Sequence, residues 1–192
     1  MFIKEAEIKR LFKEAYKGVG LRIANDGEGL MFTGRAWKMY FFRENFPKEM
    51  MGAAITLTGE IPEPRNQILY NAEGAQTELF GTEPSLYKQA LEAQAEGSIV
   101  DASCDIMIRG MLDRTYRILK DDDDREYAIL ERFAALPEPG LCDNNENYHG
   151  CYAAEDRWLY WLSDYMAYAF PSYVTEDEIK GRARELKEAG II

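Results

Sequence analysis

The spacing of apolar residues changes near Pro84, from strand-like to helical, and this change limits the folds that the chain can adopt. Before it, residues 20–72 contain short runs of apolar residues separated by turn residues, a pattern typical of β-strands. After it, apolar residues recur at helical spacing in longer segments. Strands grouped first and helices grouped later predict an α+β fold, with the helices packed on one face of a sheet. Because no linker-like segment divides the halves, we expect a single domain over residues 1–192.

The first half, residues 1–80, is predicted to contain an N-terminal helix and the sheet. Residues 3–17 place apolar side chains on one helical face, and Gly18 is a natural stop. The five residues 25–29 (NDGEG) are typical of a hairpin turn, because glycine tolerates positive φ. Further strands are predicted over residues 35–45, 53–62 and 67–71. Together these segments predict an antiparallel meander of four to five strands over residues 20–72.

The second half, residues 81–192, is predicted to form a layer of about five helices. Pro84 lies near the expected first turn of one helix and Gly97 at its end. Ser98 and Asp101 match the spacing of a capping box, and so do Thr175 and Glu178. The helices are predicted over residues 84–97, 98–118, 121–136 and 154–170, and from residue 175 onward.

The net charge of −11 lies wholly in the second half of the chain. Residues 1–80 carry 11 basic and 11 acidic side chains, whereas residues 81–192 carry 12 basic and 23 acidic ones. Like charges repel, so direct nucleic-acid binding by the acidic half is not expected. The charge suits a basic protein partner, such as a nucleic-acid-handling protein that an acidic inhibitor neutralises. Solubility alone is the alternative explanation of the charge.

Two acidic clusters are the predicted docking residues within this half. Both are expected to begin helices, where carboxylates cap free N–H groups, complement the helix dipole and remain exposed. They are Asp121, Asp122, Asp123 and Asp124 in the first cluster, and Glu176, Asp177 and Glu178 in the second.

The segment 141–152 places His149, the only histidine, between two of the three cysteines, Cys142 and Cys151. With Cys104 these residues have the composition of a Cys₃His zinc site. Structural zinc sites contain close cysteine pairs, whereas the local pattern here is C-x₆-H-x-C. We therefore expect no metal and no other cofactor.

The same segment supports an alternative function, a small hydrolase or transferase. Its nucleophile would be Cys142, with His149 as the base and Asp143 as a nearby carboxylate. The surrounding negative charge raises the pKa of a thiol and opposes this chemistry. We expect the segment to be a polar connector.

The most apolar predicted helix, residues 154–170, places Trp158, Trp161 and Tyr165 on one stripe. Such a stripe is buried at the centre of the helical layer or covered by a partner. Tyrosine and tryptophan are enriched in protein interfaces, so a homodimer formed through this stripe is the alternative to burial. A structural or self-assembling protein is the second alternative function.

The predicted compartment follows from what the sequence lacks. The charged N-terminus has no apolar core of a signal peptide, and no apolar run reaches the roughly 20 residues of a membrane span. Three dispersed cysteines do not predict a disulfide framework, which favours a cytoplasmic protein. The sequence thus predicts an acidic, non-enzymatic protein-binding module, with the two alternatives left open.

Overall fold

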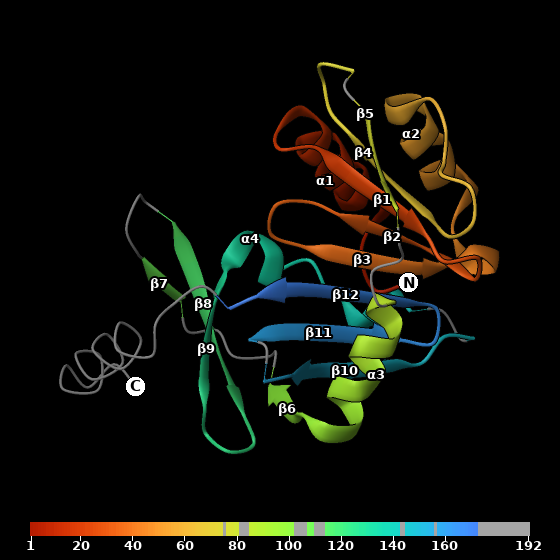
Figure 1. Cartoon of the computed structure of the whole chain (residues 1–192). Coiled ribbons are helices and arrows are strands. Elements are labelled where there is room, and N and C mark those ends of the chain that lie inside the picture. Colours follow the sequence, from red (N-terminus) through yellow and green to blue (C-terminus); the bar gives the residue numbers. More distant parts are fainter. Residues whose placement is uncertain are drawn as a thin grey trace.

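The two halves of the chain meet at the pairing of strands β3 (Lys38–Phe42) and β12 (Met166–Pro171), with Tyr40 opposite Ala167. This antiparallel pairing continues the sheet of the first half into that of the second (Figure 1). The computed structural model describes residues 1–74, 76–80, 85–101, 107–109, 114–142, 145–155 and 157–172, with only the backbone of 76–80 and 108. Within these residues the sheet has 12 strands in the order β5-β4-β1-β2-β3-β12-β11-β10-β6-β8-β7, and β9 pairs with β8.

The first half of the chain forms one part of this sheet. The turn between its first two strands forms because Asp26 Oδ1 accepts the backbone N–H of Glu28 at 2.9 Å and of Gly29 at 2.7 Å. Gly27 in the same turn has φ 100°, which glycine adopts without a steric penalty. The elements besides β3 are α1 (Glu5–Lys17), β1 (Leu21–Asn25), β2 (Gly29–Thr33), η1 (Arg43–Asn45), α2 (Lys48–Thr58), β4 (Asn66–Tyr70) and β5 (Gln76–Phe80).

The second half of the chain forms the other part of the sheet. Its elements besides β12 are α3 (Leu86–Glu96), β6 (Ser98–Asp101), β7 (Met107–Arg109), β8 (Thr115–Asp121), β9 (Glu126–Leu130), α4 (Glu131–Ala134), η3 (Pro139–Leu141), β10 (Tyr148–Ala153) and β11 (Trp158–Ser163). The short strand β6 links two parts of the sheet, because Ser98 and Ile99 pair with β10 whereas Val100 and Asp101 pair with β8. Figure 1 shows the β8–β9 hairpin running across the direction of β10, β11 and β12.

Apolar side chains fill both faces of the central strands. On one face, α1, α2 and α4 cover the main core, in which Phe12 stacks on Phe32 with ring centroids 4.4 Å apart. On the other face, α3 covers a smaller core, and Figure 1 shows this helix lying across β10 to β12. Small side chains allow α3 to approach the sheet closely, and its Ala90 and the strand residues Ala167 and Ala169 are fully buried.

The structure confirms two predicted helices and corrects the rest of the predicted fold. Helices 3–17 and 84–97 are present as α1 and α3. The layer of about five helices is wrong: in the described chain, segments 98–118 and 154–170 form strands, and segment 121–136 forms β9 and the short α4. The four-to-five-strand meander is wrong as well, because the sheet has 12 described strands and residues 53–58 belong to α2.

Helices also cover both faces of the sheet rather than one, with α3 opposite α1 and α2. None of the helices among the described residues is long and apolar enough to cross a membrane. The helix predicted from residue 175 lies outside the described residues.

The aromatic segment 154–170 was misassigned because it is buried on both faces. In β11, Trp158, Tyr160 and Leu162 face α3, whereas Leu159 and Trp161 face the main core. In a strand of this kind apolar residues occupy both faces, so the sequence shows no alternation of apolar and polar residues. The same apolar residues fit a helical stripe equally well.

Candidate functional site

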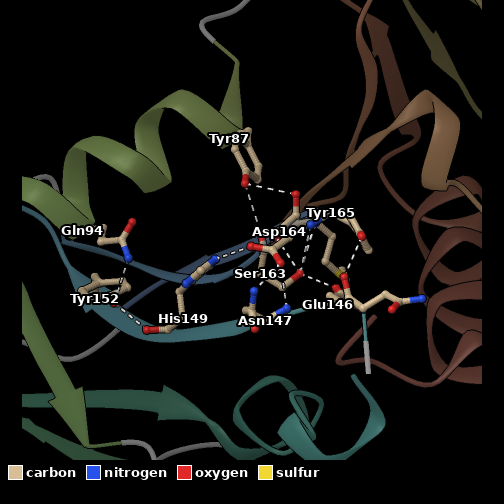
Figure 2. Close-up of polar contacts among 11 residues, drawn as sticks. Tyr87, Gln94, Glu146, Asn147, His149, Tyr152, Ser163, Asp164 and Tyr165 are labelled. Carbon is tan, nitrogen blue, oxygen red and sulfur yellow. Dashed lines mark hydrogen bonds and ion pairs between the residues drawn. The ribbon is translucent and has the colours of Figure 1, made fainter. Parts of the chain in front are cut away.

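His149 belongs to a polar cluster at the β11–β12 turn, shown in Figure 2. Its Nε2 lies 2.7 Å from Asp164 Oδ1. Asp164 Oδ2 accepts the backbone N–H of Asn147 at 2.8 Å and its side-chain amide at 2.9 Å. The backbone hydrogen bond from Asn147 and the contact with His149 lower the pKa of Asp164. The histidine thus holds an anionic aspartate, and both side chains are about a third exposed, at 33% and 29%.

Beneath this pair lies a buried hydrogen bond between Ser163 and Glu146. Ser163 Oγ donates to Glu146 Oε1 at 2.5 Å, and the amino group of Met1 pairs with the other carboxylate oxygen. Tyr87 of α3 donates its hydroxyl to the backbone carbonyls of Ser163 at 3.1 Å and Asp164 at 3.2 Å. Ser163 is fully buried, so its hydroxyl is not presented to a substrate. The cluster fixes the turn against α3 and the segment before β10 (Figure 2).

The two cysteines of segment 141–152 pack in or against the main core, whereas the side chain of His149 is a third exposed and contacts Asp164. Cys151 on β10 is 2% exposed, and burial raises the pKa of its thiol well above the usual value. Cys142 is half-buried and packs against the main core, as Tyr148 does. The ring of His149 contacts Asp164, and its backbone carbonyl accepts the hydroxyl of Tyr152 at 2.5 Å. The predicted connector therefore includes strand β10 rather than loop alone.

The remaining members of the predicted chemical sites lie outside the described residues, namely Asp143 and Cys104. Among the residues that are described, no group of three or more histidine, cysteine, aspartate or glutamate side chains is arranged to hold a metal ion.

The three aromatic residues of the predicted stripe lie in different surroundings. Trp161 is 1% exposed and stacks on Phe170 with ring centroids 4.5 Å apart. Trp158 is half-buried on the opposite face, where Lys38 Nζ lies 4.9 Å from its ring centroid. Tyr165 lies in the β11–β12 turn and donates its hydroxyl to the carbonyl of Asn145 at 2.7 Å. The strand period of two, rather than the helical period, determines these positions.

The first acidic cluster forms the turn between β8 and β9 rather than the start of a helix. Asp121 is 6% exposed, and its Oδ1 accepts the backbone N–H of Asp123 at 3.0 Å and of Arg125 at 2.8 Å. Its Oδ2 accepts the hydroxyl of Tyr127 at 2.9 Å. Burial, with the hydrogen bond to Asp121, raises the pKa of Tyr127 to about 12. Asp124 has φ 61°, a left-handed conformation that aspartate tolerates better than most residues.

This turn lies beside other acidic side chains that the sequence did not single out as a docking surface. A groove of about 470 Å³ is lined by Glu92 and Glu96 of α3, by Glu155 after β10, and by Arg125. All four side chains are exposed, as are Asp122, Asp123 and Asp124. We call these acidic residues, Glu92, Glu96, Asp122, Asp123, Asp124 and Glu155, the acidic end.

One sequence signal could have indicated part of this surface. Glu92 and Glu96 are four residues apart and therefore share one face of a correctly predicted helix. The place of Glu155 beside them depends on the pairing of β10 with β6, which the sequence did not predict. The second predicted cluster, residues 176–178, lies outside the described residues.

No model of a known protein family matches the chain, and no curated protein matches it. A comparison with solved structures found the DNA polymerase III beta chain from Streptococcus pneumoniae TIGR4, with 11% identity and a TM-score of 0.37. The match covers 90% of this chain and 64% of that chain. A likeness this weak carries no inference about function, so the chain is assigned to no family.

Proposed function

We propose that the chain is an acidic protein-binding module that docks a basic partner through its acidic end. The observation that carries this proposal is one groove lined by exposed carboxylates of α3 and of the β10–β11 turn, and by Arg125, which directly follows the exposed aspartates of the β8–β9 turn. The partner class that suits this surface best is a nucleic-acid-handling protein, whose basic surface the module would cover and inhibit.

Such a surface would act by long-range electrostatic attraction of a basic partner. The Debye length is about 8 Å at physiological salt, so charges gathered on one end of a small protein act together on an approaching partner. Steering of this kind raises the association rate more than it lowers the dissociation rate. The first half of the chain has no net charge and offers no comparable field.

The two alternative functions have less support. Cys151 is buried with a raised pKa, Ser163 is engaged with Glu146, and the ring of His149 contacts an aspartate, so no observation favours the hydrolase or transferase. The self-assembly alternative depended on an aromatic helix, but the segment is a β-hairpin whose Trp161 is 1% exposed. A homodimer of the module stays a prediction.

The proposal is tested by affinity capture from the native cell, followed by quantitative mass spectrometry at low and high salt. The variant that removes five charges from the acidic end contains Glu92→Gln, Glu96→Gln, Asp123→Asn, Asp124→Asn and Glu155→Gln. Its matched control removes five exposed charges from the first half and contains Glu28→Gln, Glu44→Gln, Glu60→Gln, Glu63→Gln and Glu73→Gln.

We expect basic proteins to be captured by the wild type and by the control, to be released by salt, and to be lost from the acidic-end variant. Asp121 is left intact in both variants because its carboxylate holds the β8–β9 turn. Capture that is equal for the two variants, or that is indifferent to salt, would contradict the proposal.

A further inference from the structure

Beside the acidic end, strand β6 changes its pairing partner from β10 to β8. Only Ser98 and Ile99 pair with β10, and the next two residues of β6 already pair with β8. Between β8 and β10, next to this crossing, lies a cavity of about 820 Å³. Binding pockets in proteins measure about 300–1,000 Å³, so the cavity has the size of a binding site. We call it the β8–β10 cavity.

The lining of this cavity is largely apolar. Ile99 of β6 contributes a side chain that is 61% exposed, whereas Trp161 and Cys151 of the main sheet belong to the main core and are 1% and 2% exposed. Val100 contributes from β6, and the segment that follows α4 contributes Ala135 and Pro137. Apolar and aromatic walls favour an apolar group over water, because each buried methylene group is stabilised by about 0.8 kcal/mol.

The charged residues of the lining favour a cation at its rim. Both lining cations have a carboxylate partner outside the lining: Arg117 donates to Glu131 at 2.6 and 2.8 Å, and Lys120 Nζ lies 3.6 Å from Glu126. The lining acids are Asp101, Asp121 and Asp122, the first and last of them exposed. The lining thus contains three carboxylates and two paired cations, and its exposed Asp122 belongs to the acidic end.

We propose that the β8–β10 cavity receives an apolar side chain from a short basic segment of the partner protein. The apolar side chain would contact Ile99, Ala135 and Pro137, while flanking lysine or arginine residues would face Asp122 and the rest of the acidic end. The inference rests on the proposed function and deepens it, because it names the sequence chemistry of the partner. The acidic end steers the partner, and the cavity selects an apolar residue between basic ones.

The test uses fluorescein-labelled pentapeptides, Lys-Lys-X-Lys-Lys with X as leucine, phenylalanine or alanine, measured by fluorescence anisotropy at low salt. Burying leucine rather than alanine adds three carbon atoms to the contact, so the leucine and phenylalanine peptides should bind at least about tenfold more tightly than the alanine peptide. All three should weaken as salt rises. Equal affinities for leucine and alanine would overturn the inference.

A pocket-filling variant locates the binding. Ala135→Trp adds a large side chain to an exposed lining position, and Ala134→Phe provides a second variant in case the first does not fold. The matched control is Ala95→Trp on the exposed face of α3, away from this lining. Ala135→Trp should weaken leucine binding about tenfold, to the level of the alanine peptide, and keep its salt dependence. Leucine binding equal to that of the control would refute the cavity as the site.

The failure of the inference differs from the failure of the proposed function. If the leucine and alanine peptides bind equally and both respond to salt, the acidic end binds basic segments and the cavity plays no part. If no basic peptide binds, both proposals fail. If Glu-Glu-Leu-Glu-Glu binds as tightly as its lysine counterpart, the cavity accepts apolar groups without a basic flank, and the inference is wrong.

Discussion

The carboxylate of Asp121 is expected to stabilise the fold by holding the β8–β9 turn. Asp121→Ala removes three hydrogen bonds, from the backbone N–H groups of Asp123 and Arg125 and from the hydroxyl of Tyr127. Each such bond contributes about 1 kcal/mol net, so we expect the free energy of unfolding to fall by about 2–3 kcal/mol. Asp121→Asn keeps an oxygen that can accept both N–H groups, and we expect a loss of only about 1 kcal/mol.

The assay is urea denaturation followed by circular dichroism, in which a lower midpoint with an unchanged slope reports a loss of stability. The control is Asp123→Ala in the same turn, which is exposed and should change stability by less than about 0.5 kcal/mol. The reasoning would be refuted if Asp121→Ala were no less stable than this control. That result would mean that all the aspartates of the turn are equivalent.

Four further predictions concern single side chains. Trp161→Ala should lower the free energy of unfolding by about 3–5 kcal/mol in the same assay, because the ring is buried in the main core. His149→Ala should cost no more than about 1 kcal/mol, since its contact with Asp164 is partly exposed. Tyr87→Phe removes a hydroxyl shared by two carbonyls, and a melting experiment should show a loss of about 1 kcal/mol. The raised pKa of Tyr127 means that the folded state disfavours the ionised form of its hydroxyl. The stability that the protonated hydroxyl contributes is therefore complete below pH about 10 and is lost as pH rises towards about 12. A tyrosinate titration of wild type against Tyr127→Phe checks this, and a titration near pH 10 for this residue would contradict it.

The sequence predicted helices α1 and α3 because each has one apolar and one polar face. It misassigned α2, whose Ile55 and Leu57 resemble strand alternation although Ile55 is 42% exposed. It also misassigned β11, because Trp158 and Trp161 fit a helical stripe and a strand buried on both faces equally well. The turn signal at Ser163 and Asp164, which separates β11 from β12, would have decided between them.

The candidate site was predictable only in part. The charge of the second half could be counted from the sequence, and Asp121 to Asp124 were singled out, but as a helix start. A run of aspartates suits both a helix N-terminus and a turn, because the carboxylate can accept nearby backbone N–H groups in either. The groove and the β8–β10 cavity depend on how β6 joins β10 to β8, which is a non-local pairing that local pattern does not reveal.

The central claim, docking of a basic partner through the acidic end, is tested most directly by the association rate of the captured partner. Stopped-flow measurements at several salt concentrations would compare the wild type, the acidic-end variant and the matched control variant. We expect the rate for the wild type and the control to fall steeply as salt rises, and the rate for the acidic-end variant to be lower and nearly independent of salt. An association rate that is equal for all three proteins and indifferent to salt would contradict the claim.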